Sequence, residues 1–286
     1  MGSGPLSVAK FTLLELGRRR LLLVFVVLAI LLTAGLGVAP FILPGFNSGD
    51  EKTVFILGGI SRVDGLAIEL CAFAVGMTVI NHDLDSGAIV AILAKPVTRV
   101  AYALGKLAAA VFLLILLDAV FTAGSILVVE FNGGGHMDVM FWFFAVSAGN
   151  AMLLMVLVMI LTVYLNNIIA AAIVVAFSFV QSQVSSVQAM VQNHLITERI
   201  LDGIVNVVYW LVPHPLQSNL ERDITISDFN VICRGGCPDL PHPSQYLAQE
   251  LAHIPGASGT GDIVYWFAYL VVVCVALYLA LRRKQV

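Results

Sequence analysis

Two acidic side chains interrupt stretches of sequence that are otherwise almost wholly apolar. Glu69 lies in one of these stretches and Asp118 in another. Charged groups are costly inside a membrane, so they usually face protein or water and often mark an ion or substrate pathway. Two interpretations stay open for both residues: a place on a translocation path, or a structural hydrogen bond to a neighbouring helix.

A stripe of polar side chains runs along a later apolar stretch. Its members are separated by 4, 3 and 4 residues, which places them on one face of a helix: Gln181, Ser185, Gln188 and Gln192. Such a face does not favour lipid. The stripe either lines a polar pathway at the centre of a dimer or forms interhelical hydrogen bonds worth about 1 kcal/mol each.

Thiol and imidazole groups gather in the polar segment near residue 235. Cys233 and Cys237 are separated by Arg-Gly-Gly, a turn tight enough to bring their sulfurs together in an oxidising compartment. The alternative is a copper or zinc site that also uses histidines of the same segment: His214, His242 and His253. Because no paired spacing such as H-x-x-x-H is present, we predict a disulfide and no metal site.

Helices that cross a membrane must position these side chains. The 286 residues are 59% hydrophobic and 12% charged, with a mean hydropathy of +0.96, whereas soluble domains are about half apolar and a quarter charged. Apolar blocks of about 18 residues or more can cross the hydrocarbon core as helices. We therefore predict an all-α integral membrane protein with a single transmembrane domain over 1–286 and six spans, at 21–43, 65–81, 104–129, 139–164, 168–190 and 263–281.

The distribution of basic residues predicts the orientation. With six alternating spans, ten of the 15 basic residues fall on one side: Lys10, Arg18, Arg19, Arg20, Lys95, Arg99, Lys106, Arg282, Arg283 and Lys284. Cytoplasmic loops keep such an excess, so both termini are expected in the cytoplasm of a cell, for instance at a bacterial inner membrane. The net charge of -3 and the scattered basic groups exclude nucleic acid as a partner.

Two segments outside the spans have distinct patterns. Residues 5–20 are predicted to form a helix at the cytoplasmic interface, with an apolar stripe, or else a plain extension of the first span; the stripe comprises Leu6, Ala9, Leu13 and Leu16. Residues 191–262 form an extracytoplasmic segment rich in proline and glycine, which predicts short helices and irregular turns. A re-entrant helix at 200–212 stays open.

The loop at 82–103 is expected on the cytoplasmic side. Asp85 or Ser86 can cap a short helix at 86–94, and Pro96 ends it. The residues of this helix are mostly apolar, and an apolar helix held in water by a short loop requires a protein partner. The alternative is an ordinary cytoplasmic turn without a partner.

This loop resembles the first cytoplasmic loop of type-2 ABC transporter permeases, which docks into a groove of the ATPase. The resemblance rests on the acidic residues before Gly87, on Leu93-Ala94-Lys95-Pro96-Val97, on Tyr102 and on Gly105-Lys106. The basic N-terminal helix, the stretch from Leu211 to Asp223 and the closing Arg282-Arg283-Lys284 are similar to the same family. Relatives often have Glu where this chain has Asp. The resemblance implies these ATPase-coupling residues: Asp83, Asp85, Gly87, Ile89, Ile92, Leu93, Lys95 and Pro96.

The resemblance also implies partners and a mechanism. Two permease copies would pair in lipid, each bound to a separate ABC ATPase that holds ATP and Mg, and closure of the ATPases would drive export. The chain itself would bind no cofactor and would not be an enzyme. In agreement, Leu107 follows the only Gly-Lys pair and Val100 replaces the first glycine of a phosphate-binding loop.

Two other functions stay open. An ion-coupled secondary transporter would use Glu69 and Asp118 as ion sites, although no convincing inverted repeat is present. An ATPase-linked assembly factor would instead serve an extracytoplasmic enzyme, of which a copper enzyme is one example.

Overall fold

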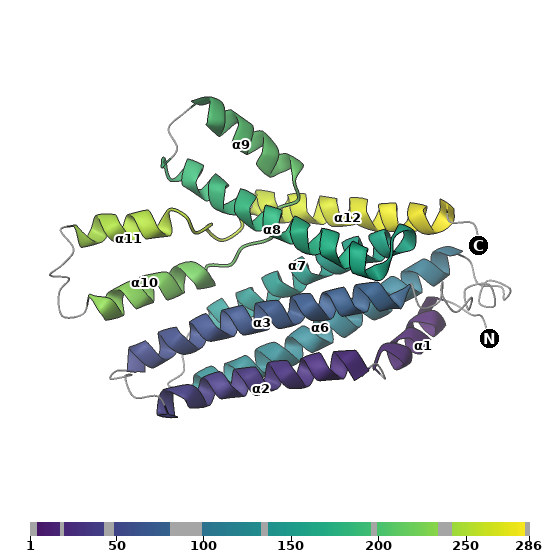
Figure 1. The fold of residues 1–286 in the computed structure, drawn as a ribbon, viewed down its shortest axis with the longest axis horizontal. Helices are drawn as coiled ribbons and strands as arrows, with labels where there is room; N and C mark the ends of the chain where they lie inside the picture. Colours follow the sequence, from purple (N-terminus) through teal and green to yellow (C-terminus); the bar gives the residue numbers. More distant parts are fainter. Residues whose placement is uncertain are drawn as a thin grey trace.

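The computed structural model describes residues 5–17, 20–42, 49–80, 99–132, 137–195, 199–233 and 242–283. Within these ranges the chain is helical, without a strand. Six long helices run roughly along the long axis of the molecule (Figure 1): α2 Arg20–Ile42, α3 Gly49–Val79, α6 Arg99–Phe131, α7 Met137–Tyr164, α8 Asn167–Gln192 and α12 Thr260–Arg283. The shorter helices are α1 Pro5–Gly17, α9 Arg199–Leu211, α10 Leu220–Ile232 and α11 Pro243–Leu251.

Five of the six long helices are apolar and long enough to cross a membrane: α2, α6, α7, α8 and α12. The chain is therefore an all-α protein with the helices of a multi-pass membrane protein. Helix α3 differs because its first half carries several charged residues. Asp50, Glu51, Lys52, Arg62 and Asp64 all precede its apolar second half.

Helix α3 begins earlier than the sequence pattern indicates. The second span is expected at 65–81, but the helix starts at Gly49. The reason is a second layer of core packing, in which Ile56, Leu57 and Ile60 of α3 are buried against α6, α7 and α10. This packing stabilises a helical first half despite its charges.

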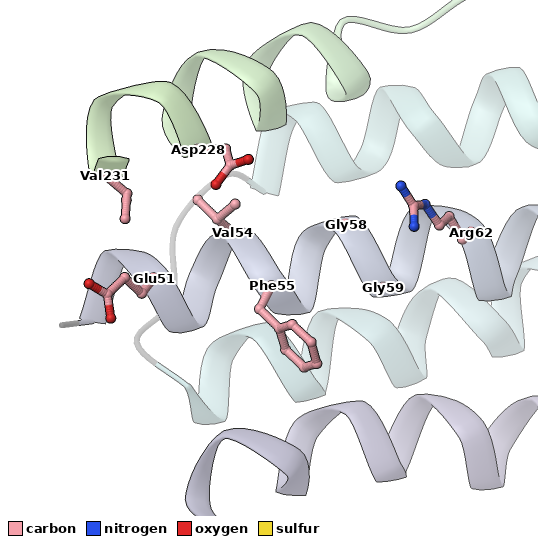
Figure 2. Close-up of a pocket in the computed structure, with 8 residues that line it drawn as sticks. All are labelled: Glu51, Val54, Phe55, Gly58, Gly59, Arg62, Asp228 and Val231. Carbon is pink, nitrogen blue, oxygen red and sulfur yellow. The ribbon is translucent and has the colours of Figure 1, made fainter. Parts of the chain in front are cut away.

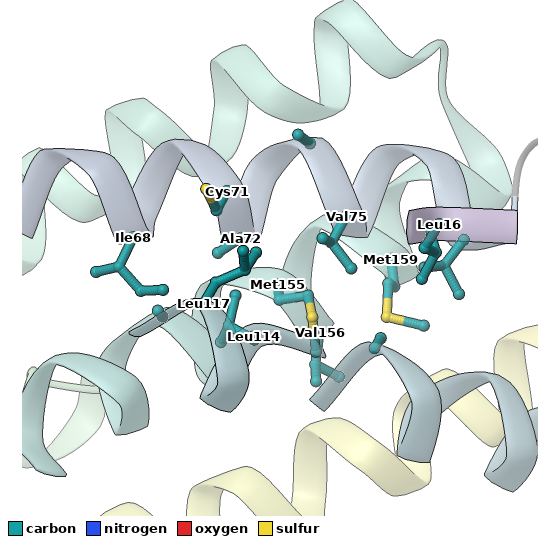
Figure 3. Packing of buried hydrophobic residues seen from close by; sticks show 14 of the residues in the cluster. Leu16, Ile68, Cys71, Ala72, Val75, Leu114, Leu117, Met155, Val156 and Met159 are labelled. Carbon is teal, nitrogen blue, oxygen red and sulfur yellow. The ribbon is translucent and has the colours of Figure 1, made fainter. Parts of the chain in front are cut away.

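The main core lies where α3, α6 and α7 meet (Figure 3). Small residues bring the helix backbones close together, and Cys71, Ala72, Ala110 and Ala151 are completely buried. Gly76 of α3 lies against α7 so closely that an ideal Cβ would be 2.8 Å from the carbonyl oxygen of Met155. This is the small-residue packing on which membrane helices depend.

Different elements lie at the two ends of the long axis of the molecule. Both chain termini lie at one end, together with the last turn of α3 and the first turn of α6 (Figure 1). Helices α10 and α11 lie at the opposite end. The connection between α3 and α6, which contains the predicted coupling loop, is therefore attached to the end with the termini.

Helix α1 packs against the first turns of α6 rather than lying free. The predicted stripe is divided: Leu16 is buried in the main core, whereas Leu6 is exposed. The buried face instead runs along Thr12 and Leu16, and Phe11 and Leu14 are exposed on the other side. Residues 5–17 therefore form a helix that is separate from α2, and its place at a membrane interface stays a prediction.

Candidate functional site

The predicted coupling residues fall outside the part of the chain that the structure describes. All eight, namely Asp83, Asp85, Gly87, Ile89, Ile92, Leu93, Lys95 and Pro96, lie outside the described residues. So does Cys237. Cys233 follows α10 and is disulfide-bonded, and its pairing with Cys237 stays a prediction.

Many of the polar side chains in the described ranges lie around the extended segment 212–219, which joins α9 to α10. We call this region the polar junction: segment 212–219 with the side chains of α7, α8, α9 and α12 that hold it. Pro213 and Pro215 keep the segment out of a helix, because proline lacks an amide hydrogen and disfavours helical geometry at the residue before it. Its backbone groups therefore need partners from other elements.

Side chains from several elements supply these partners. Asn150 of α7 pairs with both backbone groups of Leu216: its Nδ2 donates to the carbonyl oxygen at 2.9 Å, and its Oδ1 accepts from the amide at 2.8 Å. Gln181 of α8 donates to the carbonyl oxygen of Pro213. The amide of Gln217 donates to Ser258 Oγ at 2.8 Å. The segment is thus fixed at three points along its length.

His214 is the most buried side chain of the polar junction. Its ring stacks between Tyr209, with centroids 3.9 Å apart, and Tyr265, with centroids 4.7 Å apart. Nδ1 lies 3.2 Å from the carbonyl oxygen of Tyr209, and Nε2 lies 3.5 Å from Asp262 Oδ1 without forming a hydrogen bond. Burial lowers the pKa of His214, outweighing the carboxylate of Asp262, so the ring is neutral at pH 7.

The burial of His214 predicts a pH dependence of stability. Because its pKa is lower in the folded chain than in the unfolded chain, only the unfolded chain takes up the proton as the pH falls below about 6.5. Stability should therefore fall on acidification and be insensitive to this group above that pH. We expect the thermal midpoint of His214→Phe, which keeps the stacked ring, to decrease less than that of the parent between about pH 7.5 and about pH 5.5. Equal decreases would contradict this account.

The α8 stripe faces the polar junction. Gln181, Ser185 and Gln188 are buried, and Gln192 is exposed. Ser185, Gln188 and Gln192 line a cavity of about 230 Å³. Asn206 of α9 and Asp262 of α12 are also on its wall. The spacing therefore predicted a shared face, and that face points toward another part of the same chain.

Glu69 lines a second cavity of about 230 Å³, between α3, α7 and segment 212–219. Glu221, Asn150 and Ser147 are also on its wall, and Gln217 lines both this cavity and the one beside α8. Glu69 is therefore half-buried beside polar groups of the polar junction, and its carboxylate has access to a polar space.

Asp118 forms a link between helices. It is buried in α6 and accepts hydrogen bonds from Ser147 Oγ of α7 at 3.1 and 3.2 Å. Ser147 therefore both binds Asp118 and lines the cavity that contains Glu69.

A second buried carboxylate was missed by the sequence pattern. Asp64 of α3 is buried and accepts hydrogen bonds from Thr33 of α2, at 3.3 Å, and from Ser125 of α6. The predicted span began at residue 65, so Asp64 was placed outside the apolar region. Its position directly before an apolar stretch was the available signal.

A groove of about 480 Å³ lies between α3 and α10 (Figure 2). Asp228 and Val231 of α10 point toward α3, where Val54 and Glu51 lie opposite them. Gly58 and Gly59 lie further along α3. Arg62 lies toward one end of the groove. The groove is lined by both charged and apolar groups.

The described ranges contain no group of three or more His, Cys, Asp or Glu residues that could hold a metal. His214 is enclosed by aromatic rings, and His242 and His253 are exposed. The copper or zinc alternative therefore gains no support from these histidines. No protein-family model matches the chain, and no curated protein matches it either.

Proposed function

We propose that the chain is the membrane-spanning permease subunit of an ATP-driven ABC exporter, which pairs with a second permease copy and with separate ATPase subunits. In this proposal α3 is the sixth span, and the end of the bundle with both termini faces the cytoplasm of the cell. The arrangement in Figure 1 supports it, because the ends of α3 and α6 that bracket the predicted coupling loop lie at that same end. ATP and Mg would be held by the ATPase.

The contact between α1 and α6 is the observation that carries the proposal. At Gly105 of α6 an ideal Cβ would lie 2.7 Å from the carbonyl oxygen of Pro5 and 2.8 Å from Val8 Cβ. Glycine thus allows α1 to rest directly on the backbone of α6. Residues 99–103, the end of the predicted coupling loop at 82–103, already belong to the start of α6. A push on that loop would therefore move α1 and α6 together.

A buried charge reinforces this contact. Lys106 is buried, and its Nζ lies 3.7 Å from Glu15 Oε2 of α1 and 5.9 Å from the centre of the Tyr102 ring. A buried ammonium group requires such partners, and removing one of them is strongly destabilising. The contact is therefore suited to transmit force from the ATPase side into the bundle.

Membrane lipid and a second copy are the expected neighbours of the outer surfaces. Helices α2 and α12 expose large apolar side chains, among them Leu31 and Val271. Exposed apolar faces of this extent require an apolar surrounding. They support a chain that is embedded in a membrane and pairs with a second permease copy.

The connection from Asp118 through Ser147 to the cavity of Glu69 favours a second candidate, an ion-coupled secondary transporter. In that case transport by the reconstituted chain would follow an ion gradient without ATP. The two candidates are therefore separated by the energy source.

The ATPase partnership can be tested by co-purification from the native membrane. We expect the parent chain to bring down an ABC ATPase, and Ile92→Asp or Leu93→Asp to release most of it, because a charge opposes apolar docking. The matched control is Phe131→Asp, at the far end of α6, where the side chain is exposed. Absence of an ATPase from the parent preparation, or full retention by both loop variants, would contradict the proposal.

A further inference from the structure

We propose that the cavity beside α8 is a binding site for a small organic cation, whose ammonium group lies between Asp262 and Gln188. Its walls come from α8, α9, the turn 255–258 and the first turn of α12. The site does not depend on the ATPase partnership proposed above. It adds ligand recognition to the polar junction.

The size of the cavity suits a small molecule. Its volume of about 230 Å³ greatly exceeds the 10–15 Å³ or so that one water molecule requires on the same kind of measure. Polar side chains dominate its wall, including Gln188, Gln192 and Asn206. A ligand with several polar contacts would therefore be better accommodated than an acyl chain.

Gln188 supplies an unpartnered acceptor. Only 8% of this residue is exposed, and its Oε1 has no hydrogen-bond partner in the part of the chain that the structure describes. Leaving a buried polar group unpaired costs about 1–3 kcal/mol, so native proteins rarely retain one without a reason. The oxygen has almost no accessible surface, so the amide must turn toward the cavity for a ligand that donates a hydrogen bond to satisfy it.

Asp262 sets the charge of the site. It is the one charged residue among those that line the cavity in the described ranges. Arg222 does not line the cavity, although its guanidinium group lies next to the lining residue Gly256. Its Oδ2 accepts from the amide of Gly259 at 2.9 Å, and its Oδ1 accepts from the Tyr209 hydroxyl at 3.4 Å. These neutral donors orient the carboxylate without cancelling its charge, which favours a cationic ligand.

Aromatic residues complete the recognition surface. Tyr209 and Trp210 both line the cavity, and their rings meet edge to face with centroids 5.5 Å apart. Aromatic rings attract ammonium groups through the cation–π interaction. The combination of one carboxylate, amide oxygens and aromatic rings therefore fits an ammonium compound better than an anion.

Binding can be measured by titration calorimetry on the purified full chain in detergent, without nucleotide or ATPase. The probes are choline, ethanolamine and 3,3-dimethylbutan-1-ol, an uncharged molecule that has carbon in place of the choline nitrogen. We expect at least one cation to bind about tenfold or more tightly than the uncharged analogue. Failure here would leave the ATPase co-purification unaffected, so the two proposals can fail separately.

Variants locate the site. Asp262→Asn keeps the shape of the side chain and removes its charge, and it should weaken binding of either cation about tenfold. Gln188→Leu removes the unpartnered oxygen, and it should weaken binding of ethanolamine, whose ammonium group donates hydrogen bonds, about tenfold. Asp228→Asn removes a carboxylate in the groove of Figure 2 and serves as the matched control, with unchanged binding. If Gln188→Leu fails to fold, the affinity of Asp262→Asn for the cations and the affinity of the parent chain for the uncharged analogue still test the proposal. Binding of neither cation, equal binding of the analogue, or unchanged affinity in Asp262→Asn would overturn the proposal.

Discussion

Gly76→Ala is expected to destabilise the folded chain by about 2 kcal/mol, the usual cost of adding volume to a packed core. The added methyl group would lie 2.8 Å from the carbonyl oxygen of Met155 and 3.0 Å from Val158 Cβ. Neither atom is at the end of a flexible side chain, so α3 and α7 would have to move apart. Thermal unfolding of the purified chain in one detergent, followed by tryptophan fluorescence, measures the loss.

Gly65→Ala is the matched control on the same helix. An ideal Cβ at Gly65 has no neighbour within 4 Å, so the methyl group occupies open space. Replacing an unhindered helical glycine by alanine stabilises a helix by up to about 1 kcal/mol. The two substitutions should therefore shift the midpoint in opposite directions. Similar shifts would contradict the close contact between α3 and α7.

Asn150→Leu should free segment 212–219 from α7. The substitution removes both hydrogen bonds to Leu216 and leaves its half-buried amide and carbonyl without their partners. Each buried polar group that loses its partner costs about 1–3 kcal/mol, and water that enters the polar junction offsets part of this. Hydrogen exchange measured by mass spectrometry should show faster exchange in the peptide that covers 212–219.

Two further variants serve as controls for Asn150→Leu. Asn150→Asp keeps an acceptor for the Leu216 amide and loses the donor to its carbonyl, so an intermediate exchange rate is expected. Asn167→Leu makes the same chemical change at the first residue of α8, well before Gln181, and should leave exchange of that peptide unaltered. Parent-like exchange in Asn150→Leu would show that the segment is held by other contacts.

The sequence predicted the long helices well because the length of an apolar block is set by membrane thickness, a local property of the chain. The predicted spans at 104–129 and 139–164 lie within α6 and α7. The start of α3 was not predictable in this way. Its charged first half is helical because Ile56 and Ile60 pack against residues far away in the sequence.

The sequence predicted only part of the candidate site, because that site also depends on contacts between residues far apart in the chain. Helical spacing placed Gln181, Ser185 and Gln188 on one face, and all three are buried. What they face depends on contacts across long sequence separations, such as that between Gln181 and Pro213. His214 was considered as a metal ligand, whereas the structure stacks its ring between Tyr209 and Tyr265. Tyr209 is near His214 in the sequence and was the available signal, but Tyr265 belongs to the last helix and could not be paired with it from the sequence.

The placement of the partners of segment 212–219 has a consequence for biosynthesis. Asn150 and Gln181 precede the segment in the chain, whereas Ser258 and Tyr265 follow it. A growing chain can therefore attach one side of the segment early, but it cannot close the ring stack around His214 until Tyr265 has been made. Closure of the polar junction is thus a late step of assembly, and it joins the last helix to helices synthesised long before it.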